Sequence, residues 1–496
     1  MTDLPPPPPP PPRPPLPPLE PWAPPNRADR RWPTAIGIVI VGLLLVSGVA
    51  WATREAGPSA PSHPAAWDPR VADLAAFVEH ERGLPFDHPV FVDFLSPADY
   101  SEQTAHASTR SGHDKQDLER YADELRALGV ASGPLDLGTA LDQISDGGTL
   151  AFYSPSDQRV RVRGTTITVG LRVTLVHELT HALQDQRFDL QQLQRRALDD
   201  SASTALRGLA EGDALRVEAA YRGKVLSTAE RSAYDEEYAG DVANSASATA
   251  HVPAYVTATF AAPYALGQPF AVLLYDTGGN RRVDEAFRRP PTTEEHLLDP
   301  ASYLLGERSR SVDVRLHDGA HLLDHGPFGA TSWYLVLAER LDPKVALEAA
   351  LGWNGDDFAA VVEGGRTCVR AAFVGDTQRD EDQMSSALAG WAAAMPIDDA
   401  KAIEVDGHPG LVSCDPGASV DLGLTGRSAR SLALPSLWGY LEADGSSRSL
   451  LPAGDRCYAT KVVAGLTYAQ VADPAGAAFT SDAFQQRLSD ALSACR

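Results

Sequence analysis

The segment Thr174–Gln184 carries two histidines four residues apart, His177 and His181, with Glu178 directly after the first. Positions i and i+4 of an α-helix lie on the same face, so both imidazole rings can reach one ion. Neutral imidazole is a good zinc ligand, and Glu178 would lie beside the metal, where a general base is needed. Apolar residues around the motif predict a buried helix over residues 170–188. The segment therefore predicts a zinc site; a chance match on an ordinary helix is the alternative.

Two histidines and a water molecule leave one position of a tetrahedral zinc site to be filled. No further histidine follows His181 at the short spacing that some zinc helices use, so we expect a carboxylate on another helix. The next predicted helix, over residues 203–221, offers Glu211, Asp213 and Glu218. The apolar stripe of this helix includes Asp213, so periodicity does not choose among the three carboxylates.

Other polar residues are candidates for supporting this chemistry. Asp185 and Asp213 could each hold a histidine ring by a hydrogen bond, and a solvated helix surface is the alternative for both. Tyr264 and Tyr221 are candidates to donate a hydrogen bond to the oxyanion of a tetrahedral intermediate. For both tyrosines, a packing role is the alternative interpretation.

The pattern of apolar residues predicts helices and strands on both sides of this segment. We expect helices over residues 71–81, 115–128 and 331–340, and strands over residues 89–95, 149–153 and 159–163. An edge strand beside a zinc cleft can hold an extended peptide by main-chain hydrogen bonds, and an ordinary hairpin is the alternative. His317, His321 and His325 recur at a spacing of four, but intervening glycines favour a surface loop over a second metal site.

The N-terminal part of the 496-residue chain has a composition unlike the rest. Residues 1–34 are dominated by proline and are expected to form a disordered cytoplasmic tail. Residues 35–52 carry no charge, which predicts a transmembrane helix over residues 35–53, and the arginines before it place the remainder outside the cell. A cleaved signal peptide is the alternative. Residues 54–66 are rich in Pro, Ala and Ser and are expected to be a linker.

Overall charge and cysteine content restrict the partners and the compartment. The net charge of -23 argues against nucleic acid as a partner. An even number of cysteines, all in the last third of the chain, predicts two disulfides in an oxidising compartment. Three pairings are possible, of which we favour the pairing of sequence neighbours: Cys368 with Cys414, and Cys457 with Cys495.

Two motifs carry a resemblance to a known family. His-Glu-Leu-Thr-His-Ala-Leu-Gln-Asp-Gln at residues 177–186, followed by Gly-Leu-Ala-Glu-Gly-Asp-Ala at residues 208–214, resembles bacterial membrane-anchored proteins assigned as zinc metallopeptidases of the gluzincin type. In that family the glutamate of the Glu-Gly-x-Ala element is taken as the third zinc ligand, which implies Glu211. Weaker matches lie at residues 290–303 and 352–356; the family often has histidine where this chain has Asp299, so we do not expect Asp299 to be a required ligand.

The resemblance implies an α+β, mostly helical, zincin-like metallopeptidase domain behind a single N-terminal transmembrane helix. This domain would span residues 67–345, and a disulfide-containing α+β region would span residues 346–496. The implied activity is Zn²⁺-dependent hydrolysis of peptide or protein substrates outside the cell, with Glu178 as general base. The alternative is a non-catalytic cell-envelope binding or scaffold protein with the same fold. Glu178 favours the enzyme, because a purely structural zinc site does not need that carboxylate.

Overall fold

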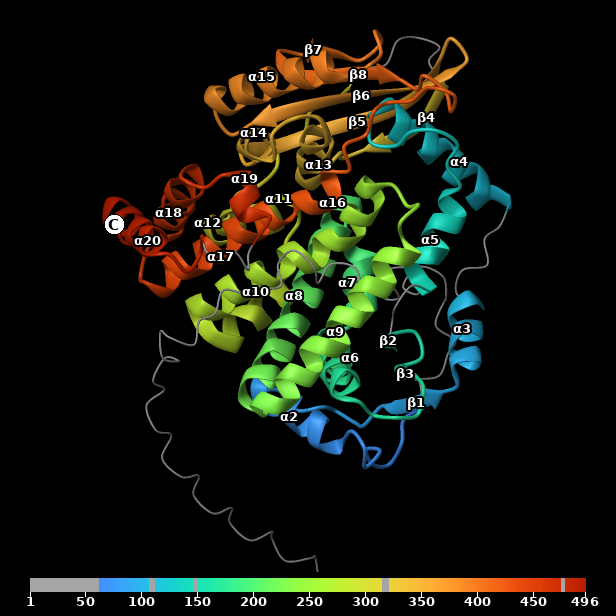
Figure 1. Ribbon diagram of the computed structural model, residues 1–496, viewed down its shortest axis with the longest axis vertical. Helices are drawn as coiled ribbons and strands as arrows, with labels where there is room; N and C mark the ends of the chain where they lie inside the picture. The colour runs from blue at the N-terminus through green and yellow to red at the C-terminus, as the bar shows by residue number, and fades with distance from the viewer. Residues whose placement is uncertain (1–61, 107–111, 147–149, 315–320, 474–477) are drawn as a thin grey trace, which may run out of the picture.

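The computed structural model describes residues 62–106, 112–146, 150–314, 321–473 and 478–496, which form a mixed α+β protein in which helices predominate (Figure 1). The predicted tail and transmembrane helix lie outside these residues. None of the helices within the described part of the chain is both long enough and apolar enough to cross a bilayer.

The first half of the described chain contains a small sheet and several long helices. Its elements are α2 (Ala72–Arg82), β1 (Phe91–Leu95), α3 (Pro97–His106), α4 (Gly112–Ala127), α5 (Leu137–Asp146), β2 (Ala151–Ser154), β3 (Arg159–Arg163), α6 (Val169–Phe188), α7 (Leu190–Arg196), α8 (Asp200–Lys224), α9 (Thr228–Ala248) and α10 (Ala254–Arg288). The helices and strands that the sequence predicts in this half are therefore confirmed, with ends that shift by a few residues.

The second half contains a larger sheet and shorter helices. Its elements are α11 (Glu295–Leu298), α12 (Pro300–Leu305), β4 (His321–Gly326), α13 (Ala330–Arg340), α14 (Pro343–Ala350), β5 (Trp353–Glu363), β6 (Arg366–Gly375), α15 (Gln378–Ala394), β7 (Lys401–Val405), β8 (His408–Cys414), α16 (Ser428–Ser431), α17 (Ala433–Ser447), α18 (Pro452–Ala464), α19 (Tyr468–Val471) and α20 (Asp482–Ala494). The predicted helix over residues 331–340 corresponds to α13, which is buried along nearly its whole length.

The small sheet has the strand order β1-β3-β2, so β2 is an edge strand. β3 pairs in parallel with β1 and antiparallel with β2, with Tyr153 opposite Val160. A cluster of buried hydrophobic residues joins this sheet to α2 and α6. The edge strand expected beside the metal helix is therefore present.

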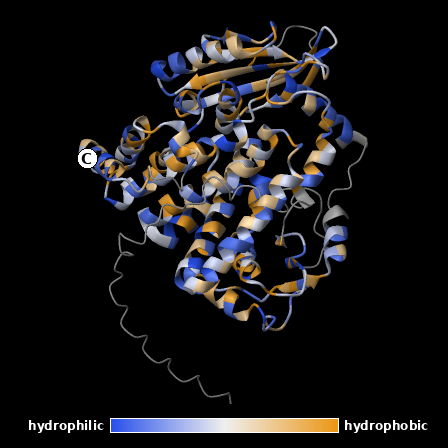
Figure 2. Cartoon of the chain, in the orientation of Figure 1, coloured by the Kyte–Doolittle hydropathy of each residue, from blue (hydrophilic) through white to orange (hydrophobic). Residues whose placement is uncertain are grey.

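The five-stranded sheet lies at the top of Figure 1, with the order β4-β5-β6-β8-β7 and antiparallel pairing throughout. Its central strands are strongly hydrophobic (Figure 2), and α15 packs Met384, Leu388 and Trp391 as buried residues. The expectation of a surface loop at His321 and His325 was wrong, because this segment pairs with β5 as the edge strand β4. The side chains of β4 are nevertheless largely exposed, which is why the loop and strand patterns look alike.

Two disulfides join the predicted neighbours. Cys368 and Cys414 are opposite one another on β6 and β8, with an S–S distance of 2.07 Å. Cys457 on α18 is bonded to Cys495 after α20 at 1.98 Å. The favoured pairing is confirmed.

The hydrophobic core is continuous across the two halves. Its main cluster includes residues from Tyr100 to Ala491, and β4, which precedes residue 345, belongs to the same sheet as β5. Asp356 on β5 joins residues on the two sides of position 345, because its carboxylate accepts hydrogen bonds from the main chain at Gly329 and from the indole of Trp333 at 2.8 and 2.9 Å. The Gly352–Asp356 motif therefore has a structural role at this junction.

α8 and α10 approach each other so closely that their backbones touch. A Cβ atom on Gly212 would lie 1.9 Å from the carbonyl oxygen of Gly267, and one on Gly267 would lie 2.0 Å from the carbonyl oxygen of Gly208. No side chain fits at either crossing point, so glycine is required there. Glu211 lies directly beside this contact. The contact fixes the position of α8 along its axis and its rotation about that axis.

Candidate metal centre

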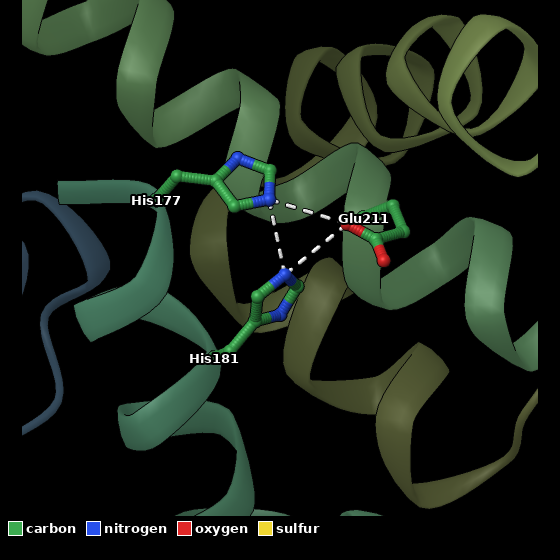
Figure 3. Close-up of side chains that lie close together, drawn as sticks. All are labelled: His177, His181 and Glu211. Carbon is green, nitrogen blue, oxygen red and sulfur yellow. Dashed lines mark hydrogen bonds and ion pairs between the residues drawn. The ribbon is translucent and has the colours of Figure 1, made fainter. Parts of the chain in front are cut away.

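Three side chains from two buried helices converge on one point (Figure 3). The Nε2 atoms of His177 and His181, one turn apart on α6, are 3.0 Å apart. Oε2 of Glu211, from α8, lies 3.2 Å from the first and 3.1 Å from the second. The three residues are 2%, 6% and 2% exposed.

These separations fit a tetrahedral zinc ion. Ligand atoms about 2.0–2.1 Å from a zinc ion, at tetrahedral angles, are about 3.3 Å apart. The measured separations of 3.0 to 3.2 Å are close to that value. Two imidazole nitrogens and a carboxylate oxygen are also a donor set that zinc accepts, so the residues present fit the ion.

The histidines and the carboxylate at this point stabilise each other's charged forms. Burial disfavours the charged form of His177, but hydrogen bonding to the carboxylates of Glu211 and Glu218 outweighs it and raises the pKa of His177 to about 10. Burial would raise the pKa of Glu211, yet His181 and His177 outweigh it and hold that pKa well below its usual value.

A relay of polar groups holds the ring of His181. Gln184 Oε1 lies 3.0 Å from His181 Nδ1, and because this amide oxygen can only accept, Nδ1 carries the hydrogen and Nε2 faces the ligand position. The amide nitrogen of Gln184 donates to Asp213 Oδ2 at 3.1 Å. Asp213 is fully buried and forms ion pairs with Arg82 at 2.8 Å and Arg216 at 2.9 Å. Asp213 thus supports a histidine through Gln184 and is turned away from the ligand position.

Glu218 and Asp185 have different partners. Glu218 Oε2 lies 3.5 Å from Nδ1 of His177, where it can orient the ring from the side away from Glu211. Asp185 accepts hydrogen bonds from the hydroxyl of Tyr153 at 2.8 Å and from the main chain of Leu190 at 3.0 Å. Asp185 therefore ties the end of α6 to β2 and α7 and does not hold a histidine ring in this structure.

Glu178 is buried beside the two histidines and faces the edge strand. Its Oε2 accepts a hydrogen bond from the main-chain N–H of Tyr153 at 2.7 Å. Burial raises the pKa of Glu178, and the neighbouring His177 and His181 oppose that rise. A carboxylate with a raised pKa is a better proton acceptor than an exposed one, which suits a general base.

An arginine that the sequence did not single out lies next to the third ligand. Arg207 precedes Glu211 by one turn of α8, and its Nε lies 3.9 Å from Glu211 Oε1. Its Nη2 donates to the hydroxyl of Tyr264 at 3.5 Å, so Tyr264 is near the centre through this arginine. Tyr221, by contrast, packs edge-to-face against Phe77 in the cluster around the small sheet. The i−4 spacing from Glu211 was the one available sequence signal for Arg207.

The structure thus brings His177, His181 and Glu211 to one point, places Glu178 beside them, and connects Asp213 to them through Gln184. Comparison of the chain with models of protein families, with curated proteins and with solved structures gives no match.

Proposed function

We propose that this chain is a zinc-dependent peptidase of zincin-like fold, in which His177, His181 and Glu211 hold the ion and Glu178 is the general base. One observation carries the proposal: a buried three-ligand set with zinc spacing lies directly beside a buried carboxylate. When bound, zinc polarises a peptide carbonyl and lowers the pKa of water toward about 7.

Glu178 is the group of this chain that moves protons. The N–H of Tyr153 holds Oε2, so we assign proton uptake from the attacking water to Oε1. The same carboxyl group then passes the proton to the leaving amine. Burial favours its neutral form, which makes both transfers possible near neutral pH.

The edge strand β2 is the proposed binding surface for the substrate backbone. In an antiparallel pair the N–H and C=O of one residue point to the same side. The N–H of Tyr153 points to Glu178, so its carbonyl also faces away from β3 and is available to an extended peptide. Main-chain pairing of this kind gives affinity without strong sequence preference.

Arg207 adds positive charge next to the ligand Glu211. We propose that this guanidinium, held by the hydroxyl of Tyr264, counters the negative charge that develops on the substrate oxygen. We further propose that the enzyme acts outside the cytoplasm, anchored by residues 35–53. The two disulfides support this location, because such bonds persist in oxidising compartments.

The test uses purified full-length protein, in detergent, with zinc measured by mass spectrometry and cleavage followed on a broad peptide library. Glu178→Gln should keep its zinc and melting temperature while hydrolysis falls by about 10²–10⁴-fold, the range for loss of a general base. Glu236→Gln, an exposed substitution on α9, is the matched control and should leave hydrolysis unchanged. If the zinc-loaded wild type cleaves nothing, the peptidase proposal is wrong and the chain is a scaffold protein with a zinc site.

A further inference from the structure

A second set of carboxylates converges at the junction between the helices and the large sheet. Glu295 begins α11, Glu307 follows α12, and Asp376 lies between β6 and α15. One carboxylate oxygen of each lies within 4.8 Å of the other two. Two oxygens that bind one Ca²⁺ ion at 2.3–2.6 Å are at most about 5 Å apart, so these three oxygens can reach a single ion.

Glu295 gives independent evidence that a partner belongs in this group. The residue is 2% exposed, and its Oε1 is buried and accepts no hydrogen bond within the described part of the chain. A buried carboxylate oxygen normally has a donor, because leaving it without one costs free energy. The carboxylate oxygens that Glu307 and Asp376 bring close to Glu295 are acceptors and cannot supply the missing donor when they are ionised.

Negative charge exceeds positive charge around these residues. The carboxyl groups that face one another here belong to Glu295, Asp299, Glu307, Asp376 and Glu442. Among the residues that the structure describes, Arg456 is the cation that pairs with them, bonding Glu307 at 2.8 and 2.6 Å and Asp299 at 2.6 Å. Within the described part of the chain, that guanidinium bonds Glu307 and Asp299, and it acts on Glu295 and Asp376 only through its charge.

We propose that Glu295, Glu307 and Asp376 form a binding site for Ca²⁺, separate from the His177–His181–Glu211 centre. All three donors are oxygens, which favours a hard cation over zinc. They come from a short helix, a loop and a turn, an irregular set that suits the flexible coordination of Ca²⁺ better than the strict octahedron of Mg²⁺. Water would complete the coordination, as it does at many Ca²⁺ sites.

The competing occupant of this site is a proton. Burial, together with the charges of Asp299 and Glu307, raises the pKa of Glu295 to about 9. Because a carboxylate binds Ca²⁺ in its ionised form, protons compete with the ion for this site, and the affinity should rise as the pH rises. A bound ion would join the segment after α12 to the β6–α15 turn, and so would tie the helices to the large sheet.

The experiment measures Ca²⁺ binding to full-length, zinc-loaded protein from which calcium has been removed on a chelating resin. Zinc content is measured in the same samples. About 1 mM Ca²⁺, a concentration suited to extracellular sites, should raise Tm by about 3 °C at about pH 8 and by less at about pH 6. One Ca²⁺ per chain should be retained in equilibrium dialysis.

Glu295→Gln should abolish the Ca²⁺-dependent rise in Tm while leaving zinc content unchanged. Without calcium this variant should be at least as stable as the wild type, because the amide carries no charge and can donate hydrogen bonds to the acceptors around it. Asp376→Asn, at a half-buried position, is a second variant with the same expected loss, and Asp382→Asn on the exposed face of α15 is the control. The proposal is overturned if the wild type shows no response at either pH, or if both site variants keep it. Neither readout depends on peptidase activity, so this result is separable from the proposed function.

Discussion

Two groups of potential ligands in the described part of the chain differ in their burial and in what surrounds them: the first is wholly buried, whereas in the second only Glu295 is buried. At His177, His181 and Glu211, two imidazole rings and one carboxylate meet, and Gln184 and Glu218 lie against the ring nitrogens that face away from the ligand position. At Glu295, Glu307 and Asp376, three carboxylates meet with part of one guanidinium, and one buried oxygen has no donor. The nitrogen and oxygen donors of the first set match the preferences of a borderline metal such as zinc, as we propose, and the all-oxygen donors of the second match those of a hard cation.

The two groups also differ in the elements that carry them. The first lies on α6 and α8, two long helices fixed by backbone contact with α10 and by packing on the small sheet. The second lies on one short helix and two connecting segments. Long helices hold ligands in a fixed geometry, whereas short segments leave room for a larger ion with variable coordination.

The largest expected effect comes from Glu211→Gln, which removes the one carboxylate of the first group. Zinc affinity should fall by at least about a hundred-fold, the upper end of the cost of losing a supporting partner alone. Hydrolysis should be lost with the zinc, while the Ca²⁺ response should persist. In this one variant, the zinc content tests the first group, and the change in Tm on adding Ca²⁺ tests the second. Unchanged zinc content would transfer the ligand role to Glu218.

The backbone contact between α8 and α10 is tested by Gly212→Ala. The added methyl group has no room beside the carbonyl of Gly267, so unfolding free energy should fall by about 3 kcal/mol, the upper end for overpacking. Zinc affinity should fall as well, because Glu211 is displaced with its helix. Gly223→Ala near the end of the same helix meets no atom within 4 Å and should be neutral or stabilising by up to about 1 kcal/mol. Equal urea midpoints for the two variants would contradict the close approach.

The region around Glu295, Glu307 and Asp376 should lose stability in acid, because it contains the buried His296. Burial lowers the pKa of His296 to about 4, whereas in the unfolded chain it is about 6.5. The unfolded state therefore binds more protons in this range, so the contribution of His296 is complete above about pH 6.5 and is lost as the pH falls toward 4, by about 3 kcal/mol in total. His296→Gln should remove that loss. The free energy of unfolding, measured by urea denaturation, should then change less between about pH 7 and pH 4.5 than in the wild type. His251→Gln, at an exposed histidine, should leave the pH dependence of the wild type.

The parts of the fold that the sequence predicts are those that depend on local periodicity. The i, i+4 spacing of His177 and His181 places both on one helical face whatever the rest of the chain does. Alternation and turn residues likewise locate β2 and β3, and the even cysteine count restricts the disulfides to three pairings. The choice of Glu211 among three carboxylates, by contrast, came from a family resemblance, because α8 is buried on nearly all sides and its periodicity is weak.

The parts that could not be predicted depend on contacts between distant segments. The hydrogen bond from Tyr153 to Glu178, the ion pair of Arg82 with Asp213, and the convergence of Glu295 with Asp376 each join residues that no repeat relates. β4 was missed because an exposed edge strand has no buried face to impose alternation. Gly208 and Gly212 belong to a motif that the sequence shows. The close approach of the α10 backbone, which the sequence does not show, explains why these positions are glycine.

The buried ion pair of Arg82 has a consequence for proteolytic maturation. Arg82 is the last residue of α2, and its guanidinium reaches Asp213, which holds Gln184 and through it His181. A cleavage before α2 would release a fragment that keeps this chain of contacts. A cleavage just after α2 would withdraw a cation from the interior and leave Asp213 with Arg216 alone. α2 therefore sets the latest point at which the N-terminus could be trimmed without disturbing the contacts that hold His181. If residues 35–53 anchor the chain as we propose, a cut before α2 would release an intact metal centre, and a cut after α2 would release a weakened one.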